Sequence, residues 1–344
     1  MRAPKSVIAV AIAIVLLTAG TIYAVEPIPE ESGFSGYLTV GGGYSHVKSN
    51  MISGNKMSNI GNRTVDSLTD SPDSNSTGGP NINFNLRYTF ASTRTQLFIG
   101  NAMEDALRFD FATQLGVAQE LPGNNLVAAS VLYSSIPTEV WKDPYVTDFK
   151  RSRTDRTSNG FRLAWDRIFG SQLQLQYSYR DIDIDDEYSG IFLGLTPAQQ
   201  KLLDREGDYH EAEILYRFFF DEKHAIIPSV TYNDYNLDGD AMSNDGVDFG
   251  LTYRYRHERF LLSVNGFIGY ADYDKRNPIY GKTRDDDRYG IGLMGLYHNP
   301  FGWSVPFFKR TSLYVKTGYF EADSNIDFYD TEIFTAGAGL FFRF

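Results

Sequence analysis

Alternation of apolar and polar residues over segments of about ten residues constrains this chain more than any other feature. In segment 81–90 every second residue is apolar, and the residues between are Asn, Arg or Thr. Segments 172–180 and 247–256 repeat the pattern. A period of two places alternate side chains on opposite faces of a β-strand. Strands of about 9–11 residues also match the length that crosses a bilayer at a tilt.

The same pattern recurs along the chain and predicts an all-β protein with about fourteen strands. The expected strands are 33–48, 80–90, 94–101, 107–119, 125–136, 159–168, 171–181, 209–220, 225–236, 246–257, 259–271, 287–298, 310–323 and 331–344. Tight connections alternate with long Asn-, Ser- and Asp-rich ones, with 299–309 as an exception on the tight side. An even number of strands with this alternation indicates a transmembrane antiparallel up-and-down β-barrel.

Aromatic residues, 15% of the chain, collect at the ends of the expected strands. The residues near the long-loop ends are Tyr44, Tyr133, Tyr179, Tyr232, Tyr270 and Tyr319. Those near the tight-turn ends are Tyr88, Phe90, Phe218, Phe220, Tyr253, Tyr255 and Tyr297. Two aromatic girdles with an aliphatic band between them are typical of strands that meet both lipid–water boundaries.

The first residues predict export. Arg2 and Lys5 precede an apolar run, and Ala24 offers a small residue at a cleavage position, so residues 1–24 are expected to be a signal peptide. Residues 25–32 would be a short periplasmic segment before a barrel at 33–344. An uncleaved anchor is the less favoured alternative, because the apolar run is short for a span.

The final residues resemble the terminal assembly signal of bacterial outer-membrane β-barrels, with alternating Leu340 and Phe342 before an aromatic terminus at Phe344. The stretch 32–51 also resembles the opening of a proteobacterial outer-membrane protein family of unknown function. The resemblance implies the outer membrane of a Gram-negative bacterium, with both termini periplasmic. It implies as partners the membrane lipids, lipopolysaccharide and, through the C-terminus, the barrel-assembly machinery.

Enzymatic chemistry is not expected. Segment 156–160 matches only the Ser-Asn-Gly part of the motif of the outer-membrane phospholipase, and Arg156 stands where that enzyme has its His base. An Arg cannot accept the proton of Ser158. The five His residues are scattered and the chain has no Cys. We therefore predict no catalytic residue and no cofactor, and a lipid-modifying enzyme is the least favoured function.

The long connections are acidic, and one of them carries a helix signal. Asp238, Asp240 and Asp245 are weak candidates for a divalent cation, but their spacing fits no known calcium loop, so solvated acidic loops are favoured and no metal is predicted. In connection 191–207, Thr196, Pro197 and Gln199 predict a short capped helix that ends near Gly207 and lies in the pore or on its rim.

The strand face opposite the lipid-facing one is predicted to line the lumen. Its charged residues are Arg87, Arg108, Asp110, Arg162, Arg180, Glu211, Glu213, Arg217, Asp248, Arg254, Arg256, Arg288, Lys316 and Arg343. Basic residues outnumber acidic ones here, although the chain carries a net charge of −11, a charge that disfavours nucleic acid as a partner. Unpaired charges are costly in a dry core. This wall indicates either a wet, partly constricted channel or paired bridges across a plugged lumen.

The favoured function is a porin-like passive channel for small polar solutes, anions among them. Two alternatives stay open. A closed barrel could act as a surface scaffold or adhesin through its long loops. A transporter of hydrophobic compounds would also have about fourteen strands, but such proteins carry an N-terminal plug, and only residues 25–32 precede the first strand here.

Overall fold

The computed structural model describes residues 27–56, 58–105, 110–303 and 305–344. Their strands form one antiparallel sheet that closes on itself, because the first strand pairs with the last. The first seven barrel strands are β1 (Gly33–Lys48), β4 (Ser74–Phe90), β5 (Thr95–Asp105), β6 (Asp110–Leu121), β7 (Asn125–Ile136), β9 (Arg153–Asp166) and β10 (Leu173–Ile184). The other seven are β11 (Gly207–Tyr216), β13 (His224–Leu237), β14 (Asn244–His257), β15 (Phe260–Arg276), β16 (Thr283–His298), β17 (Arg310–Ser324) and β18 (Thr331–Arg343).

Four short strands complete the sheet: β2 (Ile52–Asn55), β3 (Ser58–Asn59), β8 (Thr138–Trp141) and β12 (Phe218–Phe219). β12 prolongs β11 along β13, whereas β2, β3 and β8 belong to long connections. Five short 3₁₀ turns lie at 91–93, 122–124, 168–170, 300–302 and 327–329. The α-helix α2 spans Pro197–Lys201, and no helix among the described residues is long and apolar enough to cross a membrane.

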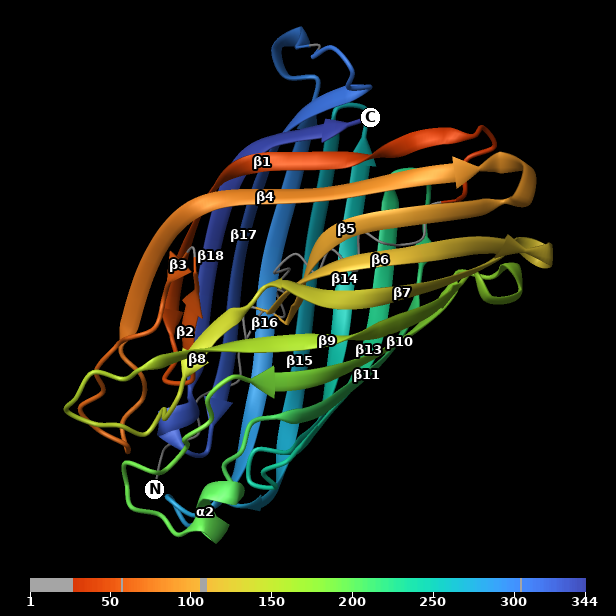
Figure 1. Ribbon diagram of the computed structural model, residues 1–344. Coiled ribbons are helices and arrows are strands. Elements are labelled where there is room, and N and C mark those ends of the chain that lie inside the picture. Colours follow the sequence, from red (N-terminus) through yellow and green to blue (C-terminus); the bar gives the residue numbers. More distant parts are fainter. Residues whose placement is uncertain (1–26, 57, 106–109, 304) are drawn as a thin grey trace.

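The closing pair of strands fixes the register of the barrel. Tyr37 faces Arg343 and Lys48 faces Glu332 along an uninterrupted β1–β18 ladder. In figure 1, β1 lies between β4 and β18, so the chain's first and last strands are neighbours. A slip of one residue would exchange the two faces of a strand. The uninterrupted β1–β18 ladder therefore fixes which side chains of these two strands face outward.

The outward face of the wall is an apolar belt. Ile82, Leu115, Val131 and Ile268 are exposed although they are aliphatic, while their neighbours in sequence point into the barrel. Such a belt is stable against lipid chains and unfavourable in water. The structure thus confirms the predicted transmembrane barrel, and the predicted strands each overlap one of its strands.

The two ends of the barrel differ. We call the end with connections 49–73, 142–152, 185–206, 238–243, 277–282 and 325–330 the loop end, and the opposite end the turn end. The loop end lies at the lower left of figure 1 with α2, β2, β3 and β8, and the turn end carries the long hairpin 299–309, blue at the top. Most loop-end connections are longer than the turn-end ones, as the sequence predicts, but hairpin 299–309 at the turn end is longer than connections 238–243, 277–282 and 325–330.

Several strands are longer at the loop end than the sequence predicts. β4 begins at Ser74, β9 at Arg153 and β16 at Thr283, all within expected connections. The acidic segments 181–187 and 285–287 therefore lie partly or wholly in strands rather than in loops. Packing accompanies the extension of β10 to Ile184, because Ile182 in this extension is buried against Tyr209 and Tyr235 inside the barrel. The predicted signal peptide, 1–24, lies outside the described residues.

Candidate functional site: a cavity beneath the loop cap

Six long connections meet over the mouth of the barrel at the loop end, and we call this assembly the cap. Its centre is an apolar cluster in which Leu203 and Phe328 are 0% exposed. The buried members are Val65, Tyr145, Leu203, Met242, Ile326, Phe328 and Tyr329. Each of the six connections contributes buried or half-buried apolar side chains to this cluster. Burial of apolar surface from all six stabilises a closed mouth.

Two tyrosines pair inside the cap. The hydroxyls of Tyr145 and Tyr329 are 2.7 Å apart, and the amide of Asn277 donates to the Tyr329 hydroxyl at 2.8 Å. Burial raises the pKa of both phenols above its usual value, so both are neutral under ordinary conditions. The three residues come from three different connections, and their hydrogen bonds tie these connections together.

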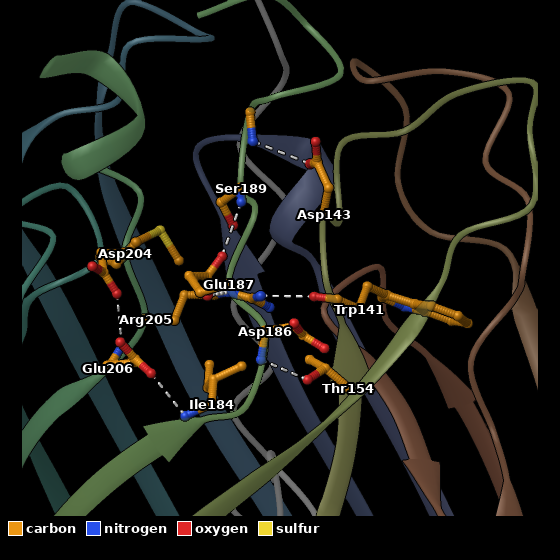
Figure 2. Close-up of polar contacts among 12 residues, drawn as sticks. Trp141, Asp143, Thr154, Ile184, Asp186, Glu187, Ser189, Asp204, Arg205 and Glu206 are labelled. Atoms are coloured by element: carbon orange, nitrogen blue, oxygen red, sulfur yellow. Dashed lines mark hydrogen bonds and ion pairs between the residues drawn. The ribbon is translucent and has the colours of Figure 1, made fainter. Parts of the chain in front are cut away.

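Polar contacts between connections 142–152 and 185–206 fix the cap from the side (Figure 2). The carboxylate of Asp143 accepts hydrogen bonds from the backbone amides of Gly190 at 3.1 Å and Phe192 at 2.9 Å. The buried Arg205 Nε lies 2.6 Å from Glu187 Oε2, and its Nη2 donates to the Trp141 carbonyl at 2.7 Å. A buried pair of this kind is costly to break, because either partner alone would remain as an uncompensated charge.

Arg151 links a further connection to the cap. Its Nη1 donates to the carbonyls of Asn50 at 2.8 Å and Pro144 at 3.0 Å, and its Nη2 donates to the carbonyl of Asn62. The guanidinium lies 4.2 Å above the ring of Trp141, which is fully buried. The side chain thus joins connections 49–73 and 142–152 by hydrogen bonds and a cation–π contact.

A cavity of about 120 Å³ lies directly beneath the cap, inside the barrel. Its apolar walls come from Met51, Ile52, Val140, Ile182, Ile184, Leu237, Met242, Ala271 and Ala322, with Tyr235, Tyr273 and Tyr329 beside them. Its charged wall consists of Arg156, Arg205, Arg284, Asp286 and Arg288. The cavity is therefore amphipathic, with an apolar body and a largely cationic side, as small-molecule sites commonly are.

Arg284 is held in a fixed position on the wall of this cavity. Its Nε and Nη2 lie 2.8 and 2.5 Å from the two carboxylate oxygens of Asp286. Its guanidinium stacks between the rings of Tyr273 at 4.4 Å and Tyr329 at 4.2 Å. A bidentate carboxylate and two aromatic faces fix the position of this cation, so it forms part of the wall.

Arg288 is engaged on one side only. Its Nη2 lies 3.0 Å from Asp248 Oδ1 and donates to the Tyr270 carbonyl at 3.1 Å. Its Nε is buried and has no hydrogen-bond partner among the described residues. A β-carbon at Gly246 would lie 2.5 Å from Arg288 Nη2, so the missing side chain makes room for this guanidinium.

The other predicted lumen residues lie along the inner wall away from the cavity. Arg180 stacks on Tyr209 at 4.5 Å, and Tyr209 donates to Glu211. The remaining contacts are Arg87 to Asn85, Arg162 to Ser178, Arg217 to Asp166 and Gln174, and Lys316 to Asn81. Glu213 and Arg254 are half-buried, whereas Arg256 and Arg343 are exposed at the turn end. Arg108 and the side chain of Asp110 lie outside the described residues.

The inner wall holds acidic partners that the sequence pattern did not identify. Asp166 Oδ1 lies 2.6 Å from Arg217 Nη1 and forms an ion pair with it. Asp286 lies on the inward face of β16 with Arg284 and Arg288. The sequence pattern places residues 205 and 284–286 in connections, because the expected strands begin at 209 and 287, and Arg205, Arg284 and Asp286 were therefore missed as site residues. The i, i+2 spacing of Arg284, Asp286 and Arg288 was the signal that could have placed all three on one strand face.

The short segment before β1 narrows the lumen at the turn end. Ile28 is 2% exposed and packs on Phe98, Ala118 and Leu126, which face into the barrel. Arg94 holds the segment by donating to the carbonyls of Ile28 at 2.6 Å and Pro29 at 2.8 Å. The segment expected to lie in the periplasm thus places one residue inside the barrel.

The loop candidates for a metal ion are not brought together. Asp238 contacts Lys201 at 2.8 Å, Asp245 accepts a hydrogen bond from Tyr232, and Asp240 is exposed. In the described part of the chain, no group of three or more His, Asp or Glu residues is arranged to hold a metal ion. Helix α2 has the predicted capping box between Thr196 and Gln199 but ends at Lys201, and Gly207 begins β11 instead.

Comparison with known proteins gives a family and a set of barrels of similar fold. The family model described as "Protein of unknown function (DUF2860)" matches residues 33–343. No curated protein matches the sequence. Similar solved structures include a Pseudomonas aeruginosa FadL homologue, with a TM-score of 0.45, 12% identity and coverage of 90% of this chain and 89% of that one. Two others are the Ralstonia pickettii toluene transporter TbuX (TM-score 0.44, 10% identity, coverage 97% and 95%) and the outer membrane channel DcaP of Acinetobacter baumannii (0.42, 10%, 91% and 97%).

Proposed function

The chain belongs to the DUF2860 family, and we propose that it is an outer-membrane channel through which small polar solutes, anions among them, pass without an energy source. The carrying observation is the capped cavity with a cationic wall, inside a barrel whose outer face is apolar. In this proposal the turn end and both termini face the periplasm of a Gram-negative cell, and the cap faces outward.

The polar inner wall supports a channel. Charged and amide side chains line the barrel over much of its length, including Arg87, Gln96, Gln114 and Arg162. A purely structural interior would be more stable with apolar side chains, because buried charges must be paired at a cost in desolvation. A water-containing path explains why the sequence retains them.

The cap supports gating at the loop end. It consists of connections, and the barrel ladders below it are complete without it. Loops of this kind open locally at a lower free energy than the strands that carry them. The cap can therefore move while the barrel keeps its hydrogen bonds.

Partners follow from the same placement. The apolar belt would contact outer-membrane lipids, and the acidic outer connections would meet lipopolysaccharide phosphates through divalent cations. The residues Leu340, Phe342 and Phe344 would present the C-terminal strand to the barrel-assembly machinery.

Planar-bilayer recording of the purified protein tests the channel. We expect discrete conductance steps and, in a salt gradient, a reversal potential that favours anions, because inward basic residues act over about one Debye length of roughly 8–10 Å. Replacing Arg254 and Arg256 together by Ser should move the reversal potential toward cation selectivity, and the shift should shrink as salt rises. If the double variant conducts with an unchanged reversal potential, anion selectivity would arise elsewhere in the lumen.

A closed scaffold or adhesin is the second candidate, because the cap covers one end and Ile28 narrows the other. It predicts no conductance, even after the cap is weakened. A transporter of hydrophobic compounds would exploit the apolar walls of the cavity and would bind neutral compounds as well as charged ones. A lipid-modifying enzyme stays least favoured, because the Ser158 hydroxyl accepts a hydrogen bond from Arg180, which cannot act as its base.

A further inference from the structure

We infer that the cavity beneath the cap is a binding site for a small organic anion, with one carboxylate on an apolar body about the size of benzoate. The inference rests on the proposed function and names the class of solute that would pause on its way through the channel. The observation that supports the inference is the position of Arg288, which is buried and engaged on one side only, on the charged wall of a cavity that also has apolar walls.

The size of the cavity limits the ligand. About 10–15 Å³ of such volume accommodates one water molecule, so 120 Å³ accommodates about ten. A benzoate ion has a similar number of non-hydrogen atoms. A disaccharide or a nucleotide has about twice as many non-hydrogen atoms and is too large for this volume.

The walls favour an apolar body over bulk water. Nine of the lining residues are aliphatic or Met, and they come from strands β2, β8, β10, β13, β15 and β17 and from connections 49–73 and 238–243. Water molecules against these walls would have few hydrogen-bond partners. An aromatic or branched hydrocarbon would replace them and bury its own apolar surface.

The ligand's carboxylate is expected at the arginine of the cavity wall that has a buried N–H donor without an acceptor. Asp286 binds the Nε and Nη2 edge of Arg284, and Arg205 is bound by Glu187 and the Trp141 carbonyl. Arg156, the fourth arginine on the wall, is also engaged by a neighbour. Arg288 is only 8% exposed, and its buried Nε donates to none of the described residues. A buried donor without an acceptor is unfavourable, and a carboxylate oxygen would satisfy it.

One negative charge fits better than two. Asp248 already lies against the Nη2 side of Arg288, with a hydrogen bond from Asn233 to its other oxygen. A dianionic group beside the Asp248 carboxylate would meet stronger repulsion than a ligand with a single negative charge. The site therefore favours a carboxylate over an inorganic or organic phosphate.

Equilibrium dialysis of radiolabelled benzoate against the full-length protein in detergent tests the inference. The method allows enough time for binding to reach equilibrium even if benzoate passes the cap slowly. We expect saturable binding at one site per chain. Unlabelled benzoate should compete, whereas benzamide, which has the same shape without the charge, and acetate, which lacks the apolar body, should compete at least about tenfold less well.

Arg288→Met should weaken benzoate binding by about tenfold or more, since a charge-assisted hydrogen bond is lost. The double variant Arg288→Met/Asp248→Asn removes both charges and guards against a fold defect from an unpaired carboxylate. Arg310→Met, which removes an exposed arginine at the start of β17, is the matched control and should bind like the wild type. Heat-modifiable migration on gels verifies that each variant is a folded barrel.

The outcomes separate the two proposals. Absence of saturable binding to the wild type, equal competition by benzamide, or unchanged binding in both Arg288 variants overturns the inference, and the channel proposal then depends on conductance alone. If the wild type binds benzoate, the Arg288 variants do not, and the protein shows no conductance, the results support the binding site and overturn the channel proposal. Equal competition by phosphate would assign the site to inorganic anions and would also overturn the inference.

Discussion

At the scale of single residues, Arg205 is the side chain on which the closed cap depends most. It is buried, and it joins Glu187 of its own connection to the Trp141 carbonyl across the mouth. Arg205→Met would leave the Glu187 carboxylate buried without its cation, a change that typically costs 3–5 kcal/mol. We expect the closed-to-open equilibrium of the cap to shift by more than about 100-fold, measured as mean conductance in planar bilayers.

The matched control for this prediction is Lys201→Met in the same connection. Lys201 also pairs with two carboxylates, Asp204 at 3.0 Å and Asp238 at 2.8 Å, but its side chain is exposed. Exposed ion pairs contribute about 1 kcal/mol or less. Equal effects of the two substitutions on conductance would mean that the buried pair does not hold the cap.

Residue-level prediction from the sequence succeeded where alternation was clean and failed where strands continued into acidic segments. Arg288 was identified as inward because its neighbours alternate, and it lines the cavity. Arg284 and Asp286 belong to the same inward face, but they lie in a run of five consecutive charged residues, 284–288, whose composition is typical of a loop. The buried role of Arg205 has no local signal, because its partners Glu187 and Trp141 are distant in the chain.

At the scale of elements, the closing strand β18 and its last residue carry the assembly prediction. Phe344 exchanges backbone hydrogen bonds with Gly36 at 3.2 and 3.3 Å, just beyond the end of the β1–β18 ladder. Phe344→Asp would remove the terminal aromatic and place a charge at the turn end. We expect it to leave most of the protein unfolded in the periplasm, with little heat-modifiable barrel in outer-membrane fractions.

Phe307→Asp is the control for the terminal position. Phe307 lies in the hairpin 299–309 at the same end of the barrel and is 97% exposed. Its backbone has a φ of 73°, a conformation that Asp tolerates better than most residues. Normal barrel levels for Phe344→Asp, or an equal loss for Phe307→Asp, would contradict a specific role for the terminal aromatic.

Elements were predictable where local chemistry decides them. The capping box of α2 could be recognised from Thr196 and Gln199, because both hydrogen bonds lie within one helical turn. The end of the helix could not, because Gly207 adopts a φ of 133° to begin β11 and not to terminate α2. The strand extensions at the loop end depend on contacts between strands and are invisible to a single segment.

At the scale of the whole molecule, the topology predicts which positions are accessible on intact cells. The chain has no Cys, so single cysteines can be introduced and labelled with an impermeant maleimide. We expect Ser74→Cys and Asp240→Cys, both exposed at the loop end, to react on intact cells. Asn124→Cys, exposed in the turn between β6 and β7, should react only after permeabilisation. Labelling of Asn124→Cys on intact cells would reverse the orientation.

The whole-molecule architecture was the most predictable level. Strand number, the alternation of connections and the lipid-facing belt all follow from repetition, and repeated weak signals reinforce one another across the chain. The cap was not predictable, because it forms from six connections without internal periodicity. Neither the predicted wet lumen nor the alternative of a plugged lumen included this arrangement, in which the apolar cluster of the cap covers a barrel with a polar inner wall.

The unequal closure of the two ends has a kinetic consequence. The loop end is held by apolar and polar contacts from six connections, whereas the turn end is narrowed by one short segment held chiefly by Ile28 and Arg94. A small structure opens locally more often than a large one. In the proposed channel, a solute in the cavity would therefore depart toward the turn end more often than it would return through the cap. Without an energy source this asymmetry would not accumulate solute, but it would make admission through the cap the step that limits inward flux.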